Sequence, residues 1–182
     1  MCKLCETNPV YEFTNKRKLC KNCFVNYFQK KFLFTIRKFG MIKLGDIVGY
    51  KKSESLNGVV LEELLNFFSK KSGIKIVKLP HKKANKIAVD SLIDSESGNI
   101  IETIIHGNAE DLKKDLPVEK DIIKPLYLFL EEEILLYANI RKLKFIEEKI
   151  KKDNIKEFIE EFEKKHPEVK RAIVNSLLEL YS

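Results

Sequence analysis

The clearest periodic pattern in this 182-residue chain is a stripe of large apolar side chains that begins just after Cys20. The stripe recurs at spacings of three and four residues, the period of one face of an α-helix. It consists of Phe24, Tyr27, Phe28, Phe32 and Ile36, and Lys31 and Thr35 stand on the same face. It predicts a helix that ends near Gly40. The residues before it, 10–19, predict a short β-hairpin with Asn15 at the turn.

Short apolar runs follow between residues 41 and 107. Strand patterns lie at 47–50, 74–79 and 87–89, and helical patterns lie at 59–68 and 100–105, with a polar, loop-like stretch at 51–58. Gly73 and Gly107 stand where the two helices are expected to end. The order strand, helix, strand, strand, helix is typical of an α/β domain with a parallel sheet.

The remainder of the chain is predicted to be mainly helical. Residues 108–121 are charged and irregular, a helix is expected at 128–143, and 154–181 reads as two helices broken at Pro167. We therefore expect three parts: an N-terminal unit at 1–40, an α/β domain at 41–150, and C-terminal helices at 151–182 that pack on it.

Four cysteines carry the strongest chemical signal. They form two CxxC pairs, Cys2 with Cys5 and Cys20 with Cys23, separated by fourteen residues, and the chain has no other cysteine. Two such pairs supply four thiolates, a ligand set typical of a closed, structural Zn²⁺ site. Two disulfides or an iron–sulfur cluster are the alternatives. Structural zinc is the prediction, and it would stabilise a small zinc-ribbon or treble-clef fold.

The net charge of +7 is concentrated in the first forty residues, where nine Lys or Arg face two Glu and the rest of the chain is neutral. A basic unit beside a neutral domain is typical of nucleic-acid binding, although a solvated lysine-rich surface gives the same composition. Aromatic residues between the cations can stack on bases. The residues expected to contact nucleic acid are Lys16, Arg17, Lys18, Lys30, Lys31, Arg37 and Lys38.

The order of the segments resembles a known family, the PP-loop enzymes that place sulfur on the wobble uridine of tRNA. The resemblance starts with the N-terminal CxxC pairs and basic helix, and it continues in Gly45-Asp46-Ile47-Val48, in the segment Lys86 to Glu96, in Lys124-Pro125-Leu126 with 131–138, and in 161–178. It covers nearly the whole chain. It implies a shortened PP-loop-like, Rossmann-like parallel-sheet domain followed by C-terminal helices, with tRNA as the ligand.

The departures from the family pattern concern the catalytic residues. The family's SGGKDS loop, whose glycines let backbone N–H groups approach a pyrophosphate, is replaced by the sequence from Lys51 to Gly58. Residues retained from a degenerate nucleotide loop are Lys52, Ser53, Ser55 and Asp94. The family's mid-domain cysteines are missing, and the insertion that holds them is expected to be deleted between 79 and 86.

These departures resemble the degenerate cytosolic thiouridylase subunit 2. The resemblance implies an accessory subunit that is not itself an enzyme, for which ATP is unlikely, and which forms a heterodimer with a catalytic PP-loop thiolase subunit in the cytoplasm. No apolar run is long enough to span a membrane. A free-standing zinc-ribbon protein that binds nucleic acid in a regulatory role is the alternative. The isolated His81, His106 and His166 are expected to be surface or helix-end residues, and the run Glu131-Glu132-Glu133 is expected to be a solvated face.

Overall fold

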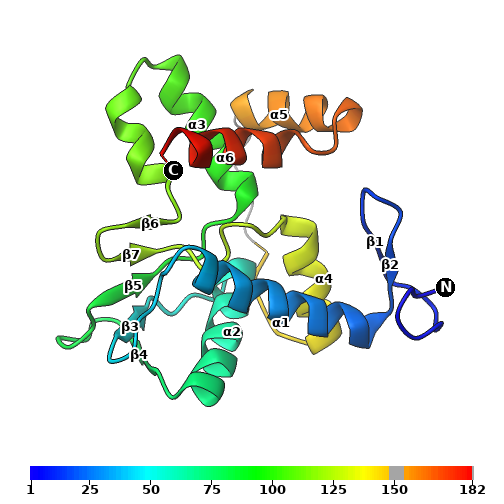
Figure 1. The fold of residues 1–182 in the computed structure, drawn as a ribbon, viewed down its shortest axis with the longest axis horizontal. Helices are drawn as coiled ribbons and strands as arrows, with labels where there is room; N and C mark the ends of the chain where they lie inside the picture. Colours follow the sequence, from blue (N-terminus) through cyan, green and yellow to red (C-terminus); the bar gives the residue numbers. More distant parts are fainter. Residues whose placement is uncertain (148–153, 182) are drawn as a thin grey trace.

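A computed structural model describes residues 1–147 and 154–181 of the chain (Figure 1). Its elements are, in order, β1 (Tyr11–Glu12), β2 (Lys18–Leu19), α1 (Lys21–Lys38), β3 (Ile47–Tyr50), α2 (Leu56–Ser72), β4 (Lys75–Lys78), β5 (Lys86–Ala88), α3 (Ile93–Ile105), the 3₁₀ helix η1 (Ala109–Asp115), β6 (Val118–Glu119), β7 (Ile122–Ile123), α4 (Glu131–Arg141), α5 (Asn154–Lys165) and α6 (Val169–Leu180).

The predicted α/β class is confirmed. Strands pair in the order β4-β3-β5-β7-β6, all parallel except β6, which closes one edge as an antiparallel strand. A separate hairpin of β1 and β2 surrounds the turn near Asn15, as predicted. Two helices begin earlier than their apolar patterns suggested. The hydroxyl of Ser55 caps α2 by accepting from the N–H of Gly58 at 3.2 Å, and α3 begins at Ile93, not at residue 100.

Gly49, within β3, leaves space for an unusually short connection between β4 and β5. Strands β4 and β5 lie on either side of β3 and run parallel to it, yet only residues 79–85 connect them, whereas parallel crossovers usually need a dozen residues or more. A Cβ on Gly49 would lie 2.6 Å from Cδ2 of Leu79 and 3.1 Å from Cβ of Ala84. The missing side chain therefore makes room for this connection to pass directly over β3.

The aromatic stripe of α1 forms the centre of the main hydrophobic core. Phe24, Phe28 and Phe32 are fully buried among side chains of α2, α4 and the sheet. The rings of Phe28 and Tyr137 stack with centroids 4.1 Å apart and an interplanar angle of 13°. The helix predicted for the unit 1–40 thus shares one core with the α/β domain.

A second, smaller core lies under α3. It buries Ile93 and Ile100 of α3, Leu112 of η1, and Val174 and Leu177 of α6. Figure 1 shows α5 and α6 together beside α3, away from the sheet. The break at Pro167 separates these two helices as predicted. Within the described part of the chain, no helix combines the length and apolar character that a bilayer crossing requires.

An acidic and a basic residue that were expected at the surface form a buried ion pair. Nζ of Lys31 lies 2.5 Å from Oε2 of Glu133, whose side chain is fully buried, and only 12% of the Lys31 side chain is exposed. The N–H of Leu130 donates to the same carboxylate at 3.0 Å. The prediction that all of 131–133 is a solvated face is therefore wrong at Glu133, and Lys31 is no longer a candidate for contacting nucleic acid.

Candidate functional site

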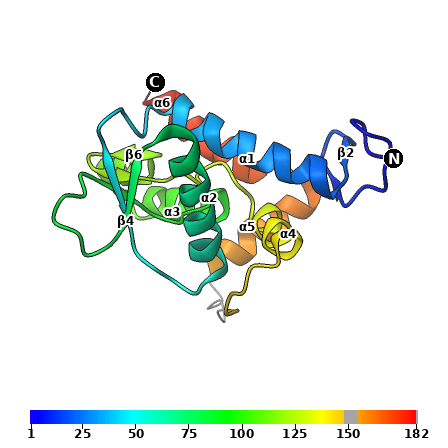
Figure 2. The same cartoon turned by 90° about the horizontal axis from the view of Figure 1, so that it is seen from below.

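The four cysteines converge at the base of the β1–β2 hairpin. Their Sγ atoms all lie within 4.8 Å of one another, with Cys5 to Cys20 at 3.3 Å and Cys23 to Cys5 at 3.6 Å. The N–H of Glu6 donates to the carbonyl of Cys2 at 3.0 Å and forms the tight first turn. Figures 1 and 2 show the N-terminal segment and the β1–β2 hairpin at the end of α1 that lies away from the sheet.

The hydrogen bonds of the cluster lower the pKa of Cys2 and of Cys20 and so favour their thiolate forms. Donation from Thr7 and from the backbone N–H of Cys23 lowers the pKa of Cys20 to about 6. Hydrogen bonds with the Cys20 and Cys5 sulfurs raise the pKa of Cys23 to about 12. Because a metal binds thiolates, filling the site would release protons, and the lowered pKa of Cys20 favours its thiolate form.

The donor set suits two kinds of metal centre. Four thiolates can surround one ion, and they can also bind a [4Fe-4S] cluster. Sulfurs around a single ion with bonds of about 2.3 Å stand about 3.8 Å apart, which is close to the spacing seen here. A cluster binds its thiolates at four separate irons, so Cys2, Cys5, Cys20 and Cys23 would have to move apart to hold one.

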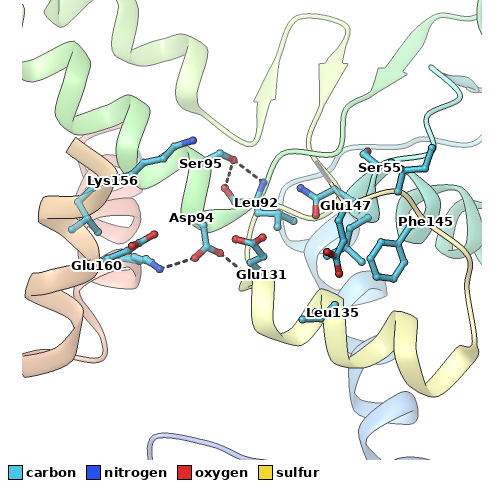
Figure 3. Close-up of a pocket in the computed structure, with 15 residues that line it drawn as sticks. Ser55, Leu92, Asp94, Ser95, Glu131, Leu135, Phe145, Glu147, Lys156 and Glu160 are labelled. Carbon is cyan, nitrogen blue, oxygen red and sulfur yellow. Dashed lines mark hydrogen bonds and ion pairs between the residues drawn. The ribbon is translucent and has the colours of Figure 1, made fainter. Parts of the chain in front are cut away.

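A pocket of about 640 Å³ lies at the carboxyl edge of the parallel strands (Figure 3). In α/β folds this edge, next to helix N-termini, is where ligands usually bind. The beginnings of α2, α3 and α4 and one side of α5 line the pocket. Its charged lining residues are Asp94, Glu131, Glu147, Glu160, Lys156 and Lys170.

The structure brings together some of the predicted nucleotide-loop residues but assigns them structural contacts. Ser55 and Asp94 line the pocket. Ser53 is not a lining residue, but its Oγ donates to Oγ of Ser55 at 2.8 Å. The carboxylate of Asp94 accepts from the N–H of Glu131 at 2.8 Å and pairs with Lys170 at 2.7 Å. Lys52 is exposed and is not part of the lining.

The remaining predicted nucleic-acid contacts fall into two groups. Lys16, Arg17 and Lys18 line a shallow groove of about 410 Å³ on the hairpin, where Lys18 pairs with Glu12 at 2.9 Å. Lys30 is exposed midway along α1. Arg37 and Lys38 are exposed in the last turn of α1, at the end that faces the sheet (Figure 2).

Sequence reasoning missed most of the pocket. Glu131, Glu147, Lys156, Glu160 and Lys170 come from α4, the stretch after α4, α5 and α6, and no local motif indicates that they meet. Glu133 did carry a signal. It stands four residues before the buried Tyr137, on the face of α4 that packs into the core, and a charge on such a face usually has a buried partner.

Comparisons with known proteins address the fold. No family model and no curated protein sequence matches the chain. By structure it is similar to the U34-tRNA thiolase NcsA from Methanococcus maripaludis with its [4Fe-4S] cluster, with a TM-score of 0.78 over 98% of this chain and 86% of that one. The chain has the fold of a PP-loop tRNA thiolase. The sequence identity is 19%, so the comparison establishes the fold and not the narrower subunit-2 family.

Two predictions are corrected by this comparison. The prediction that the chain is not an enzyme is contradicted, because its fold is that of a protein named as a thiolase. The assignment of the cofactor as structural zinc, with ATP unlikely, is also contradicted, because the similar protein carries a [4Fe-4S] cluster and four cysteines are also a ligand set for iron and sulfur. The absence of loop glycines and mid-domain cysteines was too narrow a basis for excluding an enzyme, and the spacing of the CxxC pairs does not by itself distinguish zinc from iron and sulfur.

The cysteine cluster gives a direct test by metal analysis. The unmodified protein is expected to hold about one metal centre per chain. Cys20→Ser is expected to lose it, because the three remaining thiolates would bind the metal only weakly. Iron, zinc and acid-labile sulfide are measured in protein purified without oxygen. Lys21→Ala, at the neighbouring exposed position, is the control and keeps full metal content. Equal metal content in Cys20→Ser would show that the cluster is not the binding site.

Proposed function

We propose that this chain acts in the 2-thiolation of the wobble uridine of tRNA and binds the tRNA itself. The observation that carries the proposal is the fold, which matches a U34-tRNA thiolase over 98% of the chain at a TM-score of 0.78. The cysteine cluster supports a metal centre in the same protein.

The exposed basic residues support tRNA as the ligand. Folded RNA is recognised largely through its shape and its phosphates, and cationic side chains on a protein surface supply that contact. The hairpin groove presents Lys16, Arg17 and Lys18 together, and Arg17 also lies over the ring of Phe13, 5.6 Å from its centroid. This stacking holds the guanidinium in place on the surface.

We further propose that the chain works with a second, PP-loop thiolase subunit, as the resemblance to subunit 2 suggests. All four cysteines belong to the N-terminal cluster, and the pocket at the carboxyl edge has none among its lining residues. Sulfur transfer near that pocket therefore needs a thiolate or sulfide from elsewhere, which a partner would supply. The cytoplasmic location stays a prediction.

The experiment is removal of the gene from its source organism, with 2-thiouridine in isolated tRNA measured by mass spectrometry. Loss of the modification at the wobble position is the expected result, and an unchanged level would refute the proposal. Reconstitution with tRNA, ATP and sulfide then compares the lone chain, a second PP-loop protein of the same genome, and both together. Full activity of the lone chain would support the proposed role in thiolation but contradict the proposal that a second subunit is needed.

Charge reversal on the hairpin tests the tRNA contact. Lys16→Glu with Arg17→Glu is expected to weaken tRNA binding by about tenfold or more and to reduce the slope of log affinity against log salt by about 2, one for each phosphate that is no longer neutralised. The matched control is Lys164→Glu with Lys165→Glu, an equal charge change at exposed positions of α5. Equal affinity of the hairpin variant and the wild type would exclude the hairpin as a tRNA-binding surface.

A further inference from the structure

Lysines gather at the amino edge of the five-stranded sheet, opposite the pocket. This edge consists of the loop 41–46, the turn at 120–121 and the starts of β4 and β5, and it is joined by the loop 79–85, which passes over β3 and reaches the edge at Asn85. Hydrogen bonds hold the loops together, since Nδ2 of Asn85 donates to Asp46 at 2.9 Å and the N–H of Ile47 donates to Oδ1 of Asn85 at 2.7 Å. Nζ of Lys86 donates to the carbonyl of Lys120 at 3.1 Å and connects the turn.

Sheet register brings cations from distant parts of the sequence to this edge. Lys75 pairs with Ile47 where β4 and β3 begin, Lys86 begins β5, and Lys120 lies in the turn between β6 and β7. Six lysines belong to this surface: Lys43, Lys75, Lys86 and Lys120 at the amino edge, and Lys82 and Lys83 in the adjoining loop 79–85. Three carboxylates, Asp46, Glu119 and Asp121, lie among them, so the edge is basic even though residues 41–182 are neutral as a whole.

The carboxylates leave most of this charge available. Asp46 accepts from the N–H of Lys43 at 2.6 Å and from Asn85, so its charge supports the loop. Asp121 lies 3.8 Å from Nζ of Lys86. Among the residues described by the structure, the other five lysines form no ion pair, and all five are exposed.

The amino edge continues the basic surface of α1. Arg37 and Lys38 occupy the last turn of α1, and Lys43 follows five residues after Lys38. Figure 2 places the hairpin and the loops of the sheet at opposite ends of the molecule. The 18 residues of α1 alone separate them by about 27 Å. A small anion would not reach both ends, whereas a folded RNA carries phosphates over such a distance.

We infer that the amino edge of the sheet is a second surface for RNA phosphates, which binds the same tRNA as the hairpin. This inference rests on the proposed function. Lysines suit the task because each is a mobile point charge that follows a phosphate backbone without reading its sequence. The molecule then holds RNA at two ends, along the side marked by the exposed cations of α1.

The test is Lys82→Glu with Lys83→Glu, two exposed positions in the loop 79–85 that make no ion pair in the described structure. Binding of an unmodified tRNA transcript by the full-length protein is measured at several salt concentrations. We expect about a tenfold loss of affinity and a salt slope reduced by about 2. Lys164→Glu with Lys165→Glu is again the control, and unfolding curves confirm that each variant is folded.

The outcomes separate the inference from the proposed function. Wild-type protein that binds no tRNA refutes both. If the wild type binds tRNA and the variant with Lys82→Glu and Lys83→Glu binds it with the same affinity, the second RNA surface is refuted and the proposed function is not. If both ends hold one RNA, combining the hairpin and edge variants multiplies their losses of affinity. A combined loss no larger than that of the hairpin variant alone would contradict the second surface.

Discussion

Glu133→Ala is expected to destabilise the protein by about 3–5 kcal/mol, the usual cost of removing one partner of a buried ion pair. The side chain of Glu133 is fully buried and accepts from Nζ of Lys31 at 2.5 Å, from the N–H of Leu130 at 3.0 Å and from the hydroxyl of Tyr27 at 3.4 Å. Burial lowers the pKa of Lys31, and Glu133 opposes this shift. Without the carboxylate, the ammonium remains between α1 and α4 with no counter-charge.

Urea denaturation measures the effect, with two comparisons. Glu131→Gln, two residues away and exposed, should change stability by less than about 0.5 kcal/mol. Lys31→Met combined with Glu133→Leu should recover most of the stability, because apolar side chains of similar volume can replace a buried pair. If the double variant is as unstable as Glu133→Ala, the cost comes from poorer packing and not from the unpaired charge.

Gly49→Val is expected to cost about 3 kcal/mol, the upper end of the usual range for overpacking. Even the first added carbon would lie 2.6 Å from Cδ2 of Leu79 and 3.0 Å from its Cγ. The connection 79–85 would have to lift away from β3, which would disturb the pairing of β5 with β3. Thermal or urea unfolding detects the change.

A double-mutant cycle locates the clash. Gly49→Ala and Leu79→Ala each destabilise, and in combination they should cost less than the sum of the two, because the smaller side chain at 79 makes room for the new methyl group. Additive effects would show that the connection does not press on β3. Gly98→Ala is the control, since a Cβ there meets nothing closer than 3.9 Å and lies within a helix, where alanine is favoured over glycine.

Local patterns in the sequence were sufficient for most of the elements and for the cysteine cluster, although the short strands β6 and β7 were not predicted. The stripe from Phe24 to Ile36 predicted α1 and its buried face, and the break at Pro167 predicted two C-terminal helices, because periodicity and proline act within a few residues. The starts of α2 and α3 were missed since their first turns are polar and depend on capping by Ser55 and Ser95.

The chemical predictions were less complete where they depended on distant residues. Glu133 resembled a surface charge, and Lys31, although it stands on the apolar stripe of α1, was expected to contact nucleic acid. Only the packing of α1 against α4 made the two a buried pair. The missing glycines of the nucleotide loop indicated that the chain is not an enzyme, yet the fold shared with a U34-tRNA thiolase contradicts that conclusion. A local motif reports its own chemistry, whereas a fold depends on the whole pattern of buried positions.

The sequence by itself determined that four thiolates would be available together, that a basic aromatic helix would follow them, and that an α/β domain would come next. These features depend on near neighbours in the chain, which sequence spacing describes well. The tertiary structure alone decided which charges would be buried, which would line the pocket, and which lysines would meet at the amino edge. Those outcomes depend on strand order and register, and a parallel sheet places residues side by side that are 38 positions apart in the chain, as with Val48 and Lys86.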